Sequence, residues 1–203
     1  MIEIFNTLNG EELLCLDALR GTTLRRIFGV NLDVRLMSED VSLETDQATI
    51  TLWGDVEDLG DWEGFEGQYS VLHIDEGVPS IYADTDVAAM NGPKEGSFFF
   101  HAGERIDDVI IVRERVVKVV ADEVEWEYTT DVAVIFELSS GVLAISKSAL
   151  DGELLNVTIG ESLDRLTLPP VGAFWFHWDV LGTEFLRSSK NLNVKDLVNT
   201  REA

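Results

Sequence analysis

Cysteine is almost absent from this sequence, since Cys15 is the only one among 203 residues. A single cysteine excludes a disulfide within the chain, and its place among leucines is typical of a small buried hydrophobe. The sequence also lacks an apolar run of the roughly 20 residues that a membrane-spanning helix needs. Its start, Met1-Ile2-Glu3-Ile4, has neither the basic residues nor the apolar stretch of a secretory signal. These absences predict a cytoplasmic protein that makes no contact with a membrane.

Positive charge is missing from a long part of the chain. No Lys or Arg occurs between Leu36 and Pro93, whereas 14 carboxylates fall in that span. The whole chain has 15 basic and 38 acidic side chains, which gives a net charge of −23. Nucleic acids and anionic lipids need a basic patch, so we expect neither as a partner. The charge favours a basic protein surface or metal ions as partners, or it serves only to keep the protein in solution.

Motifs for catalysis and cofactor binding are missing as well. The sequence contains no Gly-rich phosphate loop, no Gly-x-Ser-x-Gly, no Cys-x-x-Cys and no His-Glu-x-x-His. We therefore expect no cofactor and assign no metal site, and we expect a binding protein rather than an enzyme. Because catalytic residues also converge from distant positions, an enzyme stays open as the alternative.

The most informative feature that is present is a set of repeated segments. The aromatic hexapeptide 96–101 returns as 172–177, and segments 21–30 and 45–50 match 103–112 and 130–135 in the same order. Three matches in one order favour an internal duplication. Chance matches are the alternative, because β-rich sequences use few residue types.

The pattern of apolar residues predicts a mainly β fold, α+β by strict count. We expect an N-terminal segment 1–20 with one short helix, β-rich repeats over 21–102 and 103–180, and a tail over 181–203. The two repeats are expected to share one core as pseudo-symmetric halves with antiparallel sheets, either as a sandwich or as paired half-barrels. The predicted strands are 22–28, 31–37, 40–45, 47–53, 68–74 and 97–102, followed by 105–112, 115–121, 123–128, 131–138, 142–147, 154–159 and 173–178.

One predicted strand is apolar on both faces. Val132, Val134 and Phe136 alternate with Ala133 and Ile135, which are also apolar. We therefore expect this strand to be covered on both sides. The cover is the N-terminal helix, the other half of the chain, or a second subunit in a homodimer.

The clearest predicted hairpin joins this strand to 142–147. The connection is Ser139-Ser140-Gly141, and we expect Gly141 to take the positive φ that a three-residue loop requires.

Two of the three histidines end the aromatic hexapeptides. In an extended strand Trp175, His177 and Asp179 share one face, and His101 holds the position that matches His177. If the halves pack symmetrically, the two histidines meet between them, and a small-molecule or metal-dependent enzyme would have its site there. The alternative is that each histidine bonds to nearby backbone.

The acidic loop 55–66 has carboxylates at several positions of a calcium-binding EF-hand loop. Leu59 stands at the fifth position, where an oxygen ligand is needed, and the flanking segments are predicted strands rather than helices. A weak cation site and a solvated acidic turn both remain open. Trp62 and Phe65 in this loop either fold back onto the sheet or form exposed anchors for a partner.

The leading prediction is a non-enzymatic module that binds the basic surface of another protein. An inhibitor or immunity-type role, with carboxylates imitating nucleic-acid phosphates, is one example. The residues assigned to binding are Trp62, Phe65, His101, Trp175, His177 and Asp179, and two further aromatic residues of the acidic half are Trp53 and Tyr69.

Overall fold

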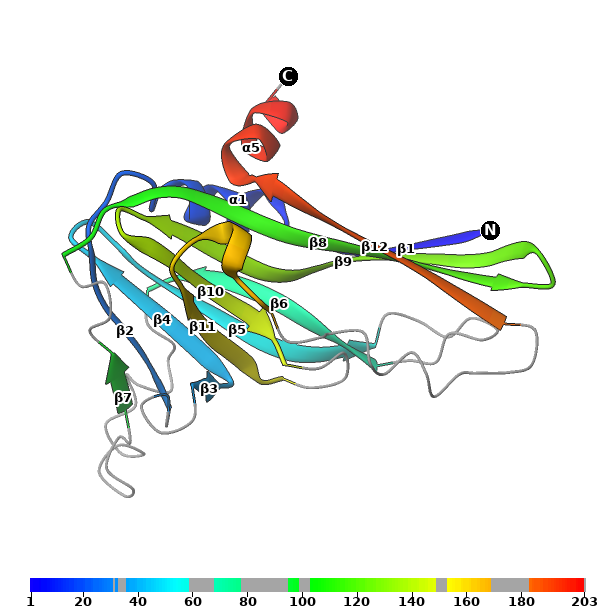
Figure 1. The fold of residues 1–203 in the computed structure, drawn as a ribbon, viewed down its shortest axis with the longest axis horizontal. Coiled ribbons are helices and arrows are strands. Elements are labelled where there is room, and N and C mark those ends of the chain that lie inside the picture. Colours follow the sequence, from blue (N-terminus) through cyan, green and yellow to red (C-terminus); the bar gives the residue numbers. More distant parts are fainter. Residues whose placement is uncertain are drawn as a thin grey trace.

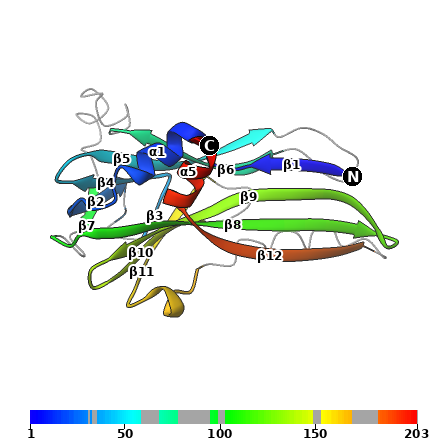
Figure 2. The same cartoon turned by 90° about the horizontal axis from the view of Figure 1, so that it is seen from above.

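The fold consists mainly of two β-sheets that face each other. A computed structural model describes residues 1–30, 32, 36–58, 68–77, 95–98, 103–148, 153–168 and 183–202. These residues also form the helices α1 (Gly10–Asp17) and α5 (Val194–Glu202), which lie close together beside the sheets (Figures 1 and 2). The prediction of a mainly β fold with antiparallel sheets in a sandwich is confirmed.

The first sheet contains the longest strands. Its order is β12 (Thr183–Asn193), β8 (Ile106–Val120), β9 (Glu123–Leu138), β10 (Gly141–Lys147), β11 (Leu155–Gly160) and β3 (Met37–Ser38). A further strand, β1 (Ile2–Asn6), pairs with β9 in the parallel direction. A short 3₁₀ helix, η1 (Leu163–Arg165), follows β11.

The second sheet is antiparallel throughout. Its order is β6 (Gln68–Glu76), β5 (Thr49–Asp58), β4 (Asp40–Thr45), β2 (Leu24–Val30) and β7 (Glu95–Phe98). The strand β6 is therefore the last of its sheet in the described part of the chain.

The hairpin of β8 and β9 projects beyond the second sheet, with β12 and β1 alongside it (Figures 1 and 2). Its turn is Ala121-Asp122, and both residues have positive φ, 49° and 68°. Positive φ at both central positions matches the right-handed twist of the flanking strands. Because neither residue is Gly or Asn, the sequence gives no clear hairpin signal here. The predicted strands 105–112 and 115–121 are one strand, β8, and 123–128 and 131–138 are likewise one strand, β9.

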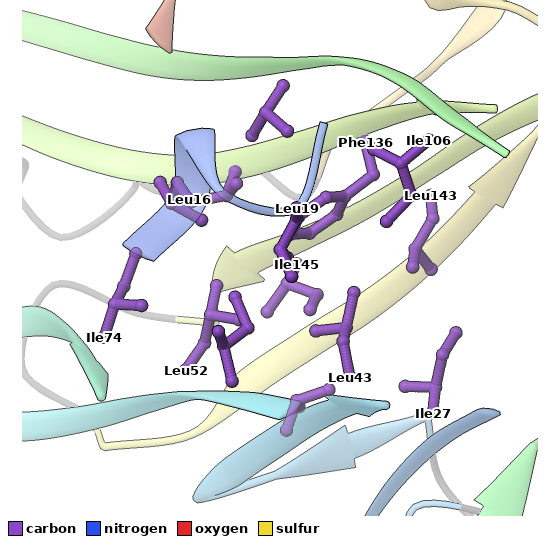
Figure 3. Packing of buried hydrophobic residues seen from close by; sticks show 14 of the residues in the cluster. Leu16, Leu19, Ile27, Leu43, Leu52, Ile74, Ile106, Phe136, Leu143 and Ile145 are labelled. Atoms are coloured by element: carbon purple, nitrogen blue, oxygen red, sulfur yellow. The ribbon is translucent and has the colours of Figure 1, made fainter. Parts of the chain in front are cut away.

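A hydrophobic core fills the space between the two sheets. Leu16 and Leu19 enter it from α1 and the residues that follow, while Leu43 and Leu52 come from the second sheet (Figure 3). Phe136 of β9 is fully buried in this core. The helix α1 thus supplies a third set of apolar side chains between the sheets.

The opposite face of β9 is also buried. Ala133 and Ile135 belong to a second cluster, against which Leu163 and Leu166 of the η1 segment and Phe185 of β12 pack. Val132 also belongs to this cluster rather than to the face of Phe136, because the pairing with β8 shifts by one residue there. The prediction that this strand is covered on both faces is confirmed. Both covers come from the same chain.

Both ends of the chain differ from the prediction. The N-terminal segment contains β1 in addition to the helix, and the C-terminal tail, in which the sequence predicts at most a short helix around Val194 to Val198, forms the strand β12 as well as the helix α5. The strand β12 pairs with β8 along its whole length. Its mixed sequence, Thr183–Asn193, lacks the alternation of a half-buried strand because most of its side chains are exposed.

The hairpin of β9 and β10 is confirmed, but its turn differs from the prediction. Gly141 already pairs with Leu138, so only Ser139 and Ser140 connect the strands. Gly141 lies in β10 and does not take positive φ. The predicted strand 173–178 and most of 31–37 and 97–102 lie outside the described residues.

The two sheets are joined at the starts of β2 and β8 by a symmetric set of hydrogen bonds. The N–H of Gly21 donates to the carbonyl of Ile106 at 2.7 Å, and the N–H of Gly103 donates to the carbonyl of Leu24, also at 2.7 Å. Gly21 and Gly103 both have positive φ, 80° and 89°. These four residues occupy equivalent positions in the matched segments 21–30 and 103–112.

The strand orders of the two sheets correspond as well. The order β7-β2-β4-β5-β6 has the same connectivity as β12-β8-β9-β10-β11. The pairing of β2 with β4 shifts by one residue between Leu24 and Arg26, and the pairing of β8 with β9 shifts at the equivalent place, between Ile106 and Asp108. The second sequence match does not follow this correspondence, because 45–50 contains the turn between β4 and β5 whereas 130–135 lies inside β9.

Replacing Gly21 or Gly103 by Ala is expected to lower the free energy of unfolding by about 1–2 kcal/mol in each case, because an L side chain is strained at these φ values. No atom lies within 4 Å of the added Cβ, so conformational strain is the main cost. Urea denaturation measures the effect. The matched Asn variants should lose less stability than the Ala variants, since Asn tolerates the left-handed region of φ and ψ. If both Ala variants were as stable as wild type, the positive φ assigned to Gly21 and Gly103 would be contradicted.

Replacing Phe136 by Ala is expected to lower the free energy of unfolding by about 3–5 kcal/mol, because a large cavity forms between the sheets. Leu154→Ala is the control, since this side chain is 41% exposed and its loss should change stability by less than about 0.5 kcal/mol. Thermal or urea denaturation measures both variants. Equal stability of the two would show that Phe136 is not the core residue described above.

Candidate functional site

None of the six residues that the sequence assigned to binding is among the described residues. They are Trp62, Phe65, His101, Trp175, His177 and Asp179. The interface between His101 and His177 and the role of the loop 55–66 beyond Asp58 therefore stay predictions. Within the described part of the chain, no group of three or more His, Cys, Asp or Glu side chains is arranged to hold a metal ion.

The described part of the acidic span between Leu36 and Pro93 contains a histidine stacked on a tryptophan. Trp53 of β5 pairs directly with His73 of β6, and their ring centroids are 4.3 Å apart at an interplanar angle of 26°. Leu52 and Leu72 point into the core, so their neighbours Trp53 and His73 lie on the opposite face of the sheet. The indole N–H of Trp53 donates to Oδ2 of Asp75 at 2.7 Å.

Two carboxylates contact the imidazole of His73. Its Nε2 lies 3.1 Å from Oε1 of Glu57, and its Nδ1 lies 3.5 Å from Oε1 of Glu12. Glu57 continues the outer face of β5, since it lies four residues beyond Trp53 on the same strand. Its side chain is 46% exposed, whereas that of Glu12 is 10% exposed.

The position of Glu12 follows from the start of α1. Glu12 forms a capping box with Asn9, in which its Oε2 accepts from the N–H of Asn9 at 2.7 Å. Its Oε1 accepts from the N–H of Ile74 in β6 at 3.2 Å. The same side chain thus caps the start of α1, accepts a hydrogen bond from the edge of β6 and contacts His73.

These contacts change the acidity of both partners. The hydrogen bond with Glu12 raises the pKa of His73, and the charges of Glu12 and Glu57 add to this effect against partial burial. Burial alone would raise the pKa of Glu12, but hydrogen bonds from His73, Asn9 and Ile74 lower it overall. The pair therefore favours a protonated His73 beside an ionised Glu12.

Further carboxylates surround this pair. Burial raises the pKa of the Cys15 thiol of α1, and the charges of Glu76, Asp75, Glu12 and Glu11 raise it further, so all four carboxylates act on this residue. We call the group that these contacts join on β5, β6 and α1 the acidic face, and its members are Glu12, Trp53, Glu57, His73 and Asp75.

Tyr69 does not belong to the acidic face. Only 3% of its surface is exposed, and its ring packs at 5.4 Å from the ring of Tyr128. The sequence suggested Tyr69 as a contact for a partner, and its burial excludes this role for the folded protein. Its apolar ring instead belongs to the second hydrophobic cluster.

A second polar group, which the sequence analysis missed, is buried around Lys147. The side chain of Lys147 is fully buried, and its Nζ donates to the carbonyl of Ser70 at 2.7 Å and to Oγ1 of Thr130 at 2.9 Å. Nδ2 of Asn6 donates to the same carbonyl at 3.0 Å and to the hydroxyl of Tyr128 at 2.8 Å. We call this group the Lys147 cluster, and it joins β1, β6, β9 and β10.

Charged neighbours border the Lys147 cluster. Asp131, which is 1% exposed, accepts two hydrogen bonds from Arg113, at 2.7 and 2.9 Å, and one from the N–H of Leu8 at 2.9 Å. Glu114 of β8 pairs with Arg187 of β12. Both Asp131 and Glu114 thus have an arginine partner.

Burial dominates the acidity of Lys147. It lowers the pKa of the amine to about 7, although the charges of Asp131 and Glu114 act in the opposite direction. Burial also raises the pKa of Tyr128 to about 12. The sequence held one signal for this site: Leu143, Ile145 and Lys147 alternate along a predicted strand, which places the lysine on the core-facing side.

Comparison with known proteins does not identify the chain. No protein family matches it, and neither a curated protein nor a solved structure shows significant similarity. None of the helices in the described residues is long and apolar enough to cross a membrane.

His73→Gln is expected to destabilise the protein more at pH 6 than at pH 8.5. Because the folded-state pKa of His73 is raised, its stabilising contribution is complete below the unfolded value of 6.5 and is lost as the pH rises through the folded value. Glu12 stays ionised at both pH values, since its pKa is lowered. Urea denaturation at the two pH values measures the difference, and an equal loss at both would contradict the ion pair.

Proposed function

We propose that this protein is a non-enzymatic module that binds the basic surface of another protein through its acidic face. The single observation that carries the proposal is the cluster of three carboxylates, Glu12, Glu57 and Asp75, in contact with the stacked rings of Trp53 and His73. Carboxylates attract a basic partner over several ångströms and speed its encounter, and an aromatic ring gives the contact an apolar anchor.

The charge distribution supports the same proposal. The 14 carboxylates between Leu36 and Pro93 have no Lys or Arg among them in the sequence. In the first sheet, by contrast, basic side chains are paired within the chain, as in Arg113 with Asp131 and Arg115 with Glu127. The second sheet therefore keeps a net negative field that is available to a partner.

One example of such a module is an inhibitor or immunity protein that covers the basic active site of a nuclease. Its carboxylates would take the positions of nucleic-acid phosphates. This example rests on charge, and the partner of the acidic face is otherwise any protein with a cluster of Lys and Arg.

An internal duplication is our proposal for the origin of the two sheets. It is supported by the equivalent hydrogen bonds of Gly21 and Gly103 and by the matching strand orders. The second unit then extends to Asn193, beyond the boundary at residue 180 that the sequence suggested. The acidic field would be a later specialisation of the first unit.

The double variant Glu57→Gln/Asp75→Asn is expected to weaken binding to an arginine-rich peptide, because it removes two charges beside Trp53. Calorimetric titration at low salt measures the affinity. The control is Glu161→Gln/Glu184→Gln, which makes the same change in net charge at two exposed sites away from the acidic face. We expect the first variant to lose several-fold more affinity than the second.

Salt and partner capture complete the test. Binding should fall strongly between low salt and about 0.5 M salt, because exposed charges are screened over a few ångströms at that ionic strength. Equal effects of the two double variants would remove the acidic face as the contact. If a pull-down at low salt captures no basic protein, or if the measured affinity does not change with salt concentration, the proposed function itself is overturned.

A further inference from the structure

The Lys147 cluster lies where the chain changes partners in the first sheet. The strand β9 pairs with β1 over 126–130 and with β10 over 133–138, and the two partners end on either side of Asp131. The second sheet reaches the same point through Ser70 of β6. The amine of Lys147 therefore contacts strands of both sheets at the place where their hydrogen bonding is interrupted.

Ser70 supplies the acceptor that holds this junction together. β6 is the last described strand of its sheet, and the Ser70 carbonyl accepts from Lys147 at 2.7 Å and from Asn6 at 3.0 Å. Without these donors a buried carbonyl would lack a partner, which costs about 1–3 kcal/mol. The docking of β6 against β1 and β10 thus depends on donors from side chains.

The number of hydrogen bonds at Lys147 fits the neutral amine. An ammonium has three N–H donors, and in the described part of the chain Nζ has two acceptors, Ser70 and Thr130. A neutral amine uses both acceptors and leaves no donor unsatisfied. A proton taken up in the closed structure is buried with one donor unmatched, whereas in an opened structure water supplies the third acceptor.

We propose that Lys147 makes the junction of β1, β6, β9 and β10 a pH-sensitive lock, which is closed around the neutral amine and opens more readily when the lysine is protonated. The lock depends on the fold and not on the partner of the acidic face.

The charged groups around the amine do not cancel this effect. Asp131 of β9 and Glu114 of β8 favour a protonated lysine, but Arg113 neutralises the first and Arg187 of β12 the second. Tyr128 of β9 stays neutral, because its pKa is raised to about 12. The groups facing Lys147 from β1 and β6, the Asn6 amide and the Ser70 carbonyl, carry no charge.

The direction of the pH effect follows from the two states of the lysine. Its pKa is about 7 when buried and 10.5 when exposed to water, so the open form binds the proton more tightly. Between these two values the closed form gains over the open form as the pH rises, by about tenfold per pH unit. Below pH 7 both forms are protonated and the dependence ends.

The test compares wild type with Lys147→Met by hydrogen exchange and urea denaturation between pH 7 and 9. After correction for intrinsic exchange, amides of β1 and β6 in wild type should become about tenfold better protected per pH unit relative to the variant. Lys195→Met is the matched control, because Lys195 is exposed, and it should follow wild type. A difference between wild type and Lys147→Met that does not change with pH would overturn the lock.

A second measurement does not depend on the variant folding. The Cε chemical shift of Lys147 in wild type, followed by NMR from pH 6 to 11, reports the protonation of the amine directly. A midpoint near 7 supports the lock, and a midpoint near that of an exposed lysine overturns it even if Lys147→Met is unfolded.

Discussion

The buried edge of β6 is the constraint on which the rest of the structure depends. An edge strand presents N–H and C=O groups without ladder partners, and burying them without hydrogen bonds is costly. In this protein a carboxylate, that of Glu12, accepts from the N–H of Ile74, while Lys147 and Asn6 donate to the carbonyl of Ser70. Buried polar side chains are thus the means by which one sheet docks its edge against the other elements.

This constraint links the core to the surface. Glu12 is held by the first turn of α1 and by β6, so the carboxylate that contacts His73 cannot move away without breaking a helix cap. The acidic face is therefore built on α1, β5 and β6 rather than on a loop. Further along the same edge, Ser70 connects β6 to the Lys147 cluster, so the acidic face and the buried amine share one strand.

Much of the fold follows from alternation in the sequence. The strands β4, β6, β10 and β11 were predicted to within about two residues, because each alternates or is fully apolar and is bounded by turn residues. The N-terminal helix was predicted from Asn9 and the acidic first turn that follows it. The strand β12 and the turn at Ala121-Asp122 were missed, because an exposed edge strand has no apolar face and the turn has no glycine. Of the candidate site, the excess of carboxylates and Trp53 were visible in the sequence, whereas the contact of His73 with Glu12 joins residues 61 positions apart.

The sequence by itself determined the class of fold, the two-sided burial of β9 and the acidic field, since each depends on the order and type of neighbouring residues. Only the tertiary structure decided that Tyr69 is buried, that the strand β12 completes a sheet, and that Lys147 faces a carbonyl of the other sheet. The physical reason is that hydrogen bonding at a sheet edge and the acidity of a buried group depend on which distant segment arrives there, and short-range patterns carry no information about that partner.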